Sequence, residues 1–386
     1  MLATASDPLR PTFVEIDLAR LAENLHLIRQ KVTPAKVMPV VKANAYGHGL
    51  VPVAQHMLAN GADALGVAIL DEGIALRQAG ISAPVLVFGG VLDYQVPAYL
   101  QHNLTLTVTC VENLQGIDET ARKMRTKAKV HIKVDTGMGR LGVPYYEAEK
   151  LLEASLHCAY VQVEGIYSHF ANADAADLSY ACLQVERFNH VLTFYEKRGL
   201  PYPVRHMANS GAILQLPEAY FDLVRPGIML YGVYPSKETR RTVLVRPALT
   251  WKTHAVYSKV IPANYPVSYG STWQSDHAVR ILTLPLGYGD GYFRSLSNRG
   301  QVIVGGKKVP IVGRVCMDQC MVNLEDDTAE AGEEVLLLGE GQEQAITADD
   351  LADLVGTIPY EILTNINGRV PRVYVNHLES TGLNGE

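Results

Sequence analysis

Residues 37–49 read V-M-P-V-V-K-A-N-A-Y-G-H-G, and the interpretation of the whole chain starts from this stretch. An apolar run long enough for one buried strand ends at Lys42 and is followed by small residues and glycines. A lysine at the end of a buried strand is costly unless its amine has a partner or a chemical task. One such task is imine formation with a carbonyl group, and the alternative is a side chain that extends to solvent. The stretch by itself leaves both interpretations open.

The pattern of this stretch repeats along the chain. Eight apolar runs of strand length alternate with segments that have the apolar spacing of helices. Alternating strands and helices predict a parallel sheet, and eight such units predict a (β/α)8 TIM barrel. The predicted strands are residues 37–42, 64–68, 84–88, 104–108, 129–134, 163–168, 204–208 and 223–230.

A different texture begins after Tyr231. Helical spacing disappears until residues 348–355, and short strand-like runs replace it. Gly305 and Gly306 indicate a hairpin turn, because such turns need positive φ angles. These features predict a C-terminal antiparallel β domain. We expect residues 13–243 to form the barrel and residues 244–386, together with 1–12, to form the β domain.

Composition limits the class of protein. The chain has 386 residues, which suits two domains, and its formal charge is −6 without a basic run, which argues against a nucleic-acid partner. No stretch approaches the roughly 20 apolar residues of a membrane span, and no signal peptide is evident. Five cysteines without a Cys-x-x-Cys motif favour a reduced, cytoplasmic chain. Cys316 and Cys320 are expected to be buried thiols and not metal ligands, so we expect no metal.

Chemically active residues gather where the predicted strands end. In TIM barrels the active site lies at the C-terminal ends of the strands. Those ends carry Lys42, Arg140, His169, His206, the Asn-Ser-Gly turn at 209–211 and Arg225. Each has a structural alternative, such as a surface ion pair for Arg140, a core histidine for His169 or a helix cap for the 209–211 turn. Their joint occurrence on one rim favours an active site.

Two of these features together suggest a cofactor. Ser210 and the N–H groups around Gly227 and Ile228 suit a phosphate group. A lysine able to form an imine and a phosphate site imply pyridoxal 5′-phosphate (PLP) bound at Lys42. Arg225 would then face the pyridine nitrogen. Because arginine stays protonated, it would leave this nitrogen without a proton and make the ring a weaker electron sink.

A set of motifs points to a known family. In order along the chain they are V-V-K-A-N-A-Y-G-H-G, K-V-D-T-G-M-G-R-L-G, Y-S-H-F, H-M-A-N-S, R-P-G-I-M-L-Y-G, V-S-Y-G-S-T-W, G-Y-G-D-G-Y and I-V-G-R-V-C-M-D-Q-C. From about residue 13 to residue 375 the chain resembles the alanine racemase family. The resemblance implies a PLP-binding TIM barrel with a β domain, assembled as a homodimer with composite active sites. It also implies interconversion of L- and D-alanine, which would supply D-alanine for cell-wall peptidoglycan.

The resemblance also assigns roles to residues. Lys42 would bear PLP, Arg225 would pair with the pyridine nitrogen, and Tyr269 from the partner subunit would be the second catalytic base. His169 would lie between Arg225 and that tyrosine. Arg140 and Met317 would bind the substrate carboxylate, and Lys133 matches a lysine that is carbamylated in many members and positions the arginine. The remaining assignments are phosphate binding by Tyr46, Ser210, Gly227, Ile228 and Tyr360, and an entry corridor lined by Asp174, Tyr288, Arg294 and Arg314.

The expected mechanism needs two bases, because one base cannot readily reach both faces of a planar intermediate. Lys42 would serve one face and Tyr269 the other, with His169 and Arg225 providing positive charge near the tyrosine. The alternatives are a serine or broad-spectrum amino-acid racemase, a PLP decarboxylase with the same type of barrel, and a non-catalytic PLP carrier. Arg140 and Met317, which would hold the carboxylate, argue against a decarboxylase. The V-S-Y-G motif at 267–270 argues against a carrier.

Overall fold

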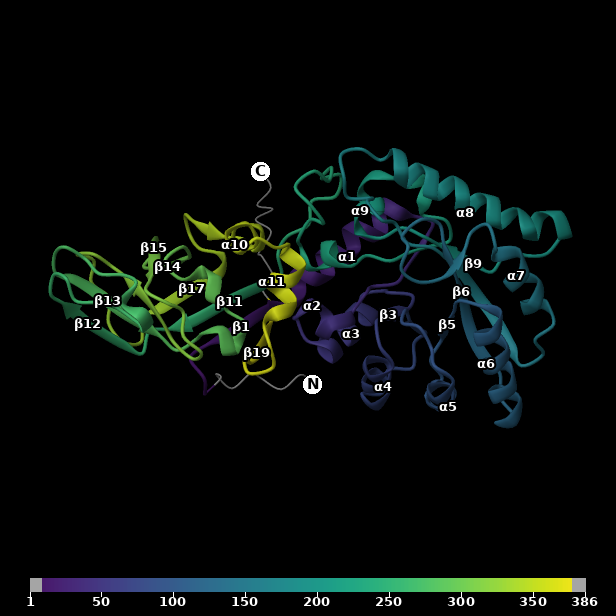
Figure 1. Cartoon of the computed structure of the whole chain (residues 1–386), viewed down its shortest axis with the longest axis horizontal. Helices are drawn as coiled ribbons and strands as arrows, with labels where there is room; N and C mark the ends of the chain where they lie inside the picture. Colours follow the sequence, from purple (N-terminus) through teal and green to yellow (C-terminus); the bar gives the residue numbers. More distant parts are fainter. Residues whose placement is uncertain (1–8, 377–386) are drawn as a thin grey trace, which may run out of the picture. The chain divides into compact units, whose positions relative to one another are not determined.

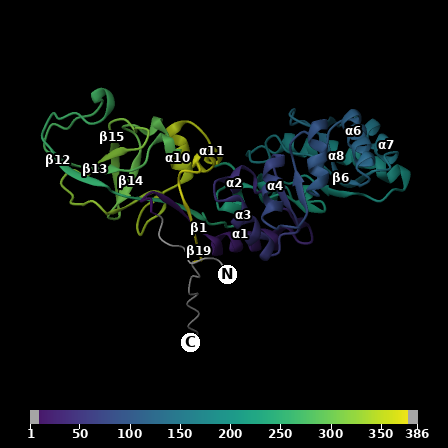
Figure 2. The same ribbon diagram turned by 90° about the horizontal axis from the view of Figure 1, so that it is seen from below.

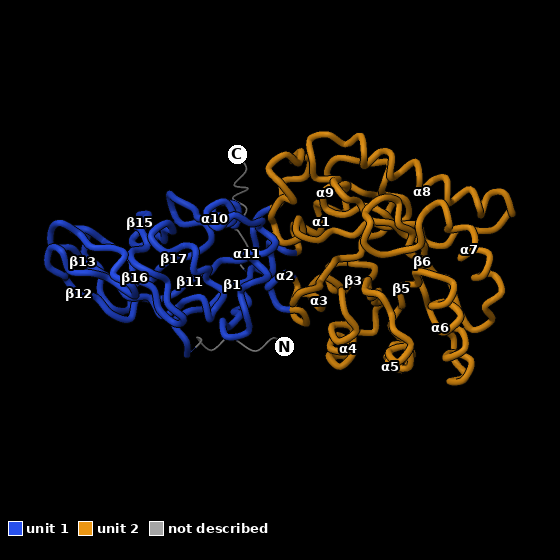
Figure 3. Tube along the Cα trace, viewed as in Figure 1, with its two compact units in different colours: residues 1–21, 46–49, 246–386 blue, residues 22–45, 50–245 orange. Residues whose placement is uncertain are grey.

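The computed structural model describes residues 9–376 and contains two compact units. Within the described chain, unit 1 comprises residues 9–21, 46–49 and 246–376, and unit 2 comprises residues 22–45 and 50–245 (Figure 3). Compared with the expected domain limits, unit 1 additionally takes the strand that begins at Phe13 and the short segment 46–49. Residues 1–8, which were expected to accompany the β domain, lie outside the described part of the chain.

Unit 2 is the predicted parallel barrel. Its strands form the order β2-β10-β9-β8-β6-β5 and a separate β3-β4 pair. Parallel bridges from Val40 to Gly66 and from Leu86 to Thr105 join the two sheets, so that eight strands of the described chain close into a ring. The strands are β2 (Lys36–Val37), β3 (Leu65–Val67), β4 (Val85–Val87), β5 (Leu106–Val108), β6 (Ala128–Asp135), β8 (Val161–Tyr167), β9 (Val204–His206) and β10 (Leu223–Val224). A short strand, β7 (Val143–Pro144), pairs with β6 outside this ring.

Helices cover the outside of the barrel strands (Figure 1), and Figure 2 shows the same ribbon turned by 90°. The longest helix, α8, ends at Gly199 with a φ of +61°, which glycine adopts easily. Its buried residues include Gln184 and Phe188, which are one turn apart on one face. The helices are α1 (Leu18–Val32), α3 (Leu50–Ala59), α4 (Leu70–Gln78), α5 (Val96–Gln101), α6 (Val111–Lys123), α7 (Ala148–Leu156), α8 (Ser179–Arg198) and α9 (Ser210–Gln215).

The eighth strand is shorter than its apolar run predicts. The run at 223–230 forms only the two residues of β10 and then a 3-10 helix, η3 (Ile228–Tyr231). Pro226 has no N–H to donate to a neighbouring strand, and the N–H of Gly227 donates to Ser210 Oγ instead. The apolar run at 223–230 therefore indicates that these residues are buried, but it does not indicate that all of them pair as a strand.

Unit 1 is the predicted β domain. Its sheet has ten strands in the described chain, with the path β12-β13-β16-β15-β14-β17-β11-β1-β19, and β18 pairs with β17. The pairs are antiparallel except for β1 with β19. The strands are β1 (Phe13–Asp17), β11 (Leu249–His254), β12 (Tyr257–Ile261), β13 (Val279–Leu284), β14 (Gln301–Val304), β15 (Lys307–Val312), β16 (Cys320–Asn323), β17 (Glu334–Glu340), β18 (Ala345–Ile346) and β19 (Arg372–Val375).

Local signals in unit 1 have mixed outcomes. Gly305 and Gly306 form the β14–β15 hairpin with φ angles of +54° and +81°, as predicted. Helix α10 (Ala348–Val355) was also predicted, and Thr347 caps it. Helix α11 (Pro359–Asn365) was not predicted, because its seven residues are too few to show a helical period. Its Pro359 stands in the first turn, where a missing N–H costs no hydrogen bond.

Candidate active site

Lys42 is followed by a left-handed turn. Ala43, Asn44, Ala45 and Tyr46 have φ angles between +51° and +56°, and these residues with Lys42 form the element α2 (Lys42–Tyr46). For residues other than glycine this conformation costs roughly 1–2 kcal/mol each. Asn44 tolerates it best, and its Oδ1 accepts a hydrogen bond of 2.9 Å from the N–H of Leu50. The backbone after the lysine is therefore strained and fixed by its own side chains.

Glu72, at the start of α4, holds the beginning of this turn. Its carboxylate accepts hydrogen bonds from the N–H of Ala43 at 2.6 Å and from the N–H of Ala68 at 2.8 Å. Burial lowers the pKa of Lys42, the positive charges of Arg140 and Arg225 lower it further, and Glu72 opposes them. A larger neutral fraction of the amine suits a nucleophile or a base. Sequence reasoning missed Glu72, whose position in the first turn of a helix resembles ordinary capping.

The loop after β6 carries Arg140. Asp135 Oδ1 accepts hydrogen bonds from the N–H groups of Gly137 and Met138, both at 2.9 Å, and of Gly139 at 3.2 Å. One carboxylate oxygen thereby orders the glycine-rich turn, and the Arg140 side chain is exposed beyond it. The sequence motif D-T-G-M-G-R thus has a local physical reason.

Lys133, at the end of β6, is buried, and its Nζ has no hydrogen-bond partner among the described residues. The ammonium position lies 4.6 Å from the centroid of the Tyr167 ring. Burial lowers the pKa of Lys133 well below its ordinary value, and the charges of Arg225 and Arg140 act in the same direction. The lowered pKa favours the neutral form of the amine, and an unpaired buried amine calls for an explanation.

Arg225 is a buried cation whose hydrogen-bond acceptors are neutral. Its guanidinium donates to His206 Nδ1 at 2.7 Å and to the carbonyls of Ser168 and Met207 at 2.8 and 3.0 Å. His169 Nδ1 lies 3.3 Å away as a further acceptor. Burial lowers the pKa of Arg225 to about 10, which still leaves it protonated at neutral pH. Arg225 therefore lies beside His169.

The hydrogen bonds continue from Arg225 through two histidines. His206 Nε2 lies 2.8 Å from His131 Nδ1, and the His206 ring stacks on Tyr167 at 4.7 Å. Burial and Arg225 lower the pKa of His131 to about 3 and the pKa of His206 well below its ordinary value. Because arginine only donates, the proton of neutral His206 must be on Nε2 and that of His131 also on Nε2. The same logic places the proton of His169 on Nε2.

His131 was not among the predicted residues. The available signal was its spacing, because His131 and Lys133 are two residues apart in one strand and so share a face. His206 was recognised as a residue of the rim, but its link to Arg225 was not. A histidine that holds another side chain has no sequence signature of its own.

Ser210 and Gly227 are joined directly. Ser210 Oγ accepts hydrogen bonds from the N–H of Gly227 at 2.9 Å and of Met229 at 3.4 Å. A Cβ on Gly211 would lie 2.6 Å from the carbonyl oxygen of Ala173, next to Asp174, so this close approach requires glycine. Asn209 caps α9 with a 3.0 Å hydrogen bond, as the structural alternative proposed. At the starts of α9 and η3, the N–H groups of Gly211 and Ile228 have no partner within their helices and can serve an anion.

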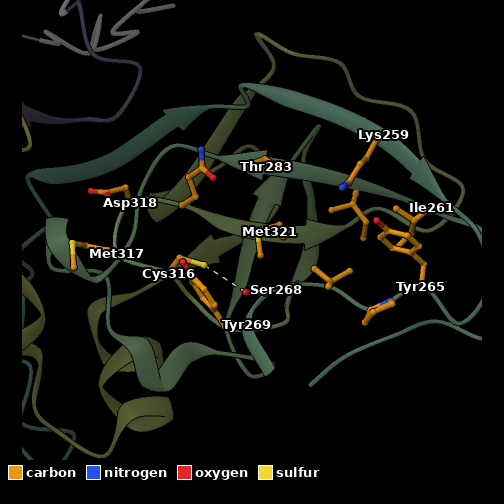
Figure 4. A pocket seen from close by; sticks show the side chains of 14 residues that line it. Lys259, Ile261, Tyr265, Ser268, Tyr269, Thr283, Cys316, Met317, Asp318 and Met321 are labelled. Carbon is orange, nitrogen blue, oxygen red and sulfur yellow. Dashed lines mark hydrogen bonds between the residues drawn. The ribbon is translucent and has the colours of Figure 1, made fainter. Parts of the chain in front are cut away.

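Tyr269 and Met317 of unit 1 line one pocket of about 650 Å³ (Figure 4). Both side chains are exposed, Tyr269 to 71% and Met317 to 52%. Ser268, beside Tyr269, donates a hydrogen bond of 2.7 Å to the carbonyl of Arg314, and the Arg314 guanidinium lies against Gly270. Two predicted residues therefore line this pocket, and Arg314 lies next to Gly270, which follows Tyr269.

Tyr288 is attached to the segment that carries Met317. The N–H of Tyr288 donates to the carbonyl of Cys316 at 3.0 Å, and the N–H of Gly289 donates to the carbonyl of Met317 at 2.9 Å. Cys316 is half-buried outside any strand, whereas Cys320 is buried in β16, so the expected pair of buried strand thiols is only partly present. Arg294 begins the 3-10 helix η6 (Arg294–Leu296) and is exposed.

Tyr46 and Tyr360 also lie together in unit 1, with ring centroids 6.1 Å apart. Burial raises the pKa of Tyr46, so its hydroxyl stays protonated. The predicted phosphate binders thus form two groups, one around Ser210 in unit 2 and one made of the two tyrosines in unit 1. Their roles as phosphate binders stay predictions.

A parallel barrel with reactive side chains at the ends of its strands, followed by an antiparallel β domain, defines a class of two-domain barrel enzymes. Residues 16–235 match the family model "Alanine racemase, N-terminal domain" and residues 248–374 match "Alanine racemase, C-terminal domain". The chain belongs to the alanine racemase family.

Individual relatives agree with this assignment. The chain is 50% identical to an alanine racemase of Carboxydothermus hydrogenoformans, over 95% of this chain and 100% of the relative. It is 45% identical to alanine racemase 2 of Caldanaerobacter subterraneus, over 96% of each chain. The alanine racemase structure from Streptomyces lavendulae superposes with a TM-score of 0.90 at 38% identity, covering 96% and 99% of the two chains. Within residues 9–376, no helix is both long and apolar enough to cross a membrane.

Proposed function

We propose that this chain is a PLP-dependent alanine racemase that interconverts L-alanine and D-alanine. The observation that carries the proposal is Lys42, an amine whose pKa is lowered by burial and by the charges of Arg140 and Arg225. An amine of this kind suits a covalent and basic role, and a neighbouring arginine suits an amino-acid carboxylate. We further propose that the product D-alanine serves peptidoglycan synthesis, and that the enzyme works in the cytoplasm, where its free thiols stay reduced.

The residues present fit PLP. Lys42 offers an amine for the aldehyde, the Ser210 hydroxyl, held by the N–H of Gly227, and the neighbouring N–H of Ile228 offer an anion site, and Arg225 offers a buried cation for the pyridine nitrogen. Tyr46 and Tyr360 would add hydroxyl groups for the phosphate. When bound, PLP withdraws electrons from the Cα of an attached amino acid and so acidifies its hydrogen. The expected limits are residues 13–243 for the PLP-binding barrel and 244–386 with 1–12 for the β domain, and we assign β1 (Phe13–Asp17) to the β domain because it pairs with β11 and β19.

Racemisation then depends on two proton-carrying groups. Lys42 Nζ takes or delivers the proton on one face of Cα, and the Tyr269 hydroxyl does so on the other. His169 Nε2–H is a donor that can stabilise the negative oxygen of a deprotonated tyrosine. Arg225, which occupies His169 Nδ1, keeps that tautomer in place.

The substrate carboxylate is bound by Arg140 and by the backbone N–H of Met317 in this proposal. Lys133 would position Arg140 after reaction of its neutral amine with carbon dioxide, which forms a carbamate and releases a proton. The carbamate would convert an unpaired amine into an anion that attracts Arg140. The side chains of Asp174, Tyr288, Arg294 and Arg314 would line the route by which alanine enters.

We also propose a homodimer in which Lys42 of one subunit and Tyr269 of the other serve the same substrate. The two residues belong to different units of the chain, and Tyr269 is exposed, so it is available to a second copy. Two-fold assemblies of this kind build two identical sites from two chains.

The test is incubation of the purified, PLP-loaded protein with L-alanine and, separately, with L-serine, followed by chiral chromatography. D-alanine should form until the two enantiomers are equal, and Lys42→Ala should form none. Faster conversion of serine than of alanine would establish the alternative, a serine or broad-spectrum racemase. No D-amino acid from either substrate would refute the proposal.

A further inference from the structure

Helix α8 presents three polar side chains to the loop after β6. Tyr180, Gln184 and Arg187 are spaced four and three residues apart, so they lie on one face of the helix. The Tyr180 hydroxyl donates to the carbonyl of Gly137 at 2.9 Å, and the Arg187 guanidinium donates to the carbonyl of Thr136 at 2.9 Å. These contacts hold the backbone that leads to Arg140.

Gln184 alone among these three also reaches the loop after β8 in the described structure. Its Nε2 donates to Thr136 Oγ1 at 3.3 Å and to the carbonyl of His169 at 3.1 Å. Its Oε1 accepts from the N–H of Ala171 at 3.0 Å. Because one partner is a carbonyl acceptor and the other is an N–H donor, the positions of Nε2 and Oε1 in the Gln184 amide are determined. The side chain is fully buried, so each of these bonds would be costly to lose.

A second link connects the same two loops. Thr136 Oγ1 and Ser168 Oγ are 2.7 Å apart, and the carbonyl of Ser168 accepts a hydrogen bond from Arg225. The hydroxyl of Thr136 therefore stands between Gln184 and the residue that precedes His169. The two loops are joined through one short network of buried polar side chains.

We propose that Gln184 is a positioning residue that fixes the loop carrying His169 relative to the loop carrying Arg140. The inference rests on the proposed function, in which one loop serves the tyrosine base and the other binds the substrate carboxylate. Among the described residues, the hydrogen bonds of the Gln184 side chain go to backbone atoms and a threonine hydroxyl, so it acts through these loops and not on the reacting atoms. Glutamine is required because glutamate lacks the N–H donors, asparagine is one methylene shorter, and methionine lacks polar atoms.

The central variant is Gln184→Met, which keeps length and volume and removes all three hydrogen bonds. Loss of a single neutral hydrogen bond corresponds to a change of about 2- to 10-fold in an equilibrium or rate constant. We expect Gln184→Met to lower kcat/KM for alanine by at least about tenfold, to raise KM and to shift the pH profile of kcat. Tyr180→Phe, which affects only the loop of Arg140, should raise KM by about 2- to 3-fold and leave the pH profile unchanged.

A second buried glutamine provides the control for stability. Gln215 on α9 donates to the carbonyls of Ala173 and Ala175, further along the same loop after β8. Gln215→Met should lower Tm by a similar amount but should leave the pH profile at that of the wild type. If Gln184→Met changes only Tm, as Gln215→Met does, Gln184 is structural and the proposal is wrong.

Hydrogen exchange separates this inference from the proposed function, because it needs no activity. Gln184→Met should speed exchange of backbone amides in both loops, at residues 136–140 and 168–171. Tyr180→Phe should do so only at 136–140. Exchange that rises in neither loop, or equally across the barrel, overturns the inference even if the wild type racemises alanine. A wild type without racemase activity refutes the proposed function alone.

Thr136→Val provides an independent variant if Gln184→Met folds poorly. It keeps the shape of the side chain and removes the hydroxyl between Gln184 and Ser168. We expect hydrogen exchange, KM and the pH profile to change in the same direction as in Gln184→Met. The changes should be smaller, because two hydrogen bonds of Gln184 remain. No change in any of the three would contradict the proposal.

Discussion

Arg225 donates a hydrogen bond of 2.7 Å to His206 Nδ1, and the other recorded acceptors of this buried cation are also uncharged. A buried charge of this kind is expensive unless it is fully hydrogen-bonded. Here four acceptors surround one guanidinium, which keeps it protonated although burial lowers its pKa to about 10. A permanent positive donor, and not an acid, therefore stands where the pyridine nitrogen is proposed to bind.

Arg225→Glu should lower racemase activity by at least about 100-fold and increase the fraction of turnovers that end in pyruvate. A carboxyl group can protonate the pyridine nitrogen, which strengthens the ring as an electron sink and permits transamination. Chiral chromatography measures racemisation, and a coupled dehydrogenase assay measures pyruvate. Arg225→Lys keeps the positive charge, so it should lose racemase activity but should not produce more pyruvate than the wild type. An Arg225→Glu enzyme with wild-type rates and products would contradict the role of Arg225.

His131 should make the folded protein less stable in acid. Its pKa is about 3 in the folded state and near 6.5 in an unfolded chain, so the unfolded state binds more protons between these values. Its contribution is complete above pH 6.5 and is lost as the pH falls towards 3, at about 1.4 kcal/mol per pH unit. Urea unfolding at pH 7.5 and 5.5 measures this slope. His131→Gln should reduce the slope, whereas His26→Gln, at an exposed histidine, should not.

Much of the fold could be predicted from the sequence, because its signals were local and repeated. Buried parallel strands are apolar on both faces, so their runs were visible between helices with clear periods. The failures came from competing interactions. Pro226 and the bond from Gly227 to Ser210 ended the eighth strand early, and α11 was too short to show a period. The pairing of β1 with β11 and β19 depends on partners more than 200 residues away.

The predicted site residues carry motifs, and the missed ones do not. Lys42 and Arg140 stand in or next to turns that contain glycines with positive φ angles, and these glycines form a recognisable sequence motif. Glu72, His131 and Gln184 are ordinary residues of helices and a strand, and only the folded chain brings them to the site. Supporting residues of this kind follow from three-dimensional contacts and not from spacing.

Lys133→Ala should lose most racemase activity and regain part of it with added chloride or short carboxylates. The reason is that an anion could then occupy the space of the proposed carbamate and attract Arg140. The carbamate itself should appear as a new carbonyl signal in carbon-13 NMR of the wild type in labelled bicarbonate, and should be absent from the variant. Wild-type activity in Lys133→Ala, without any response to anions, would refute the pairing of Lys133 with Arg140.

Replacing an alanine by glycine should stabilise the left-handed turn after Lys42, whereas the same replacement destabilises a helix. Ala43 has a φ of +52°, so Ala43→Gly should relieve about 1–2 kcal/mol of strain and lose roughly 0.5–1 kcal/mol to chain entropy. We expect a net rise in the free energy of unfolding of about 0.5–1 kcal/mol. Ala154→Gly, within helix α7, is the control and should lower it by about 1 kcal/mol. Destabilisation by both changes would show that the turn is not strained.

The proposed composite site can be tested by subunit mixing. Lys42 and Tyr269 are 227 positions apart and belong to different units. Tyr269 shares its pocket with the half-exposed Tyr265 and with the exposed Met317, so the surface around the proposed second base is open. A second copy of the chain would cover such a surface and bring the tyrosine to its barrel.

Equal amounts of inactive Lys42→Ala and inactive Tyr269→Ala, allowed to exchange subunits, should recover about a quarter of wild-type activity. Half of the dimers are then mixed, and each mixed dimer has one intact site. The control mixes the wild type with a chain that carries both changes. Composite sites predict about a quarter of full activity for that mixture, because no mixed dimer has an intact site, whereas sites within one chain predict about half. No recovery in the first mixture and half activity in the second, with exchange verified by native mass spectrometry, would mean that each chain builds its site alone.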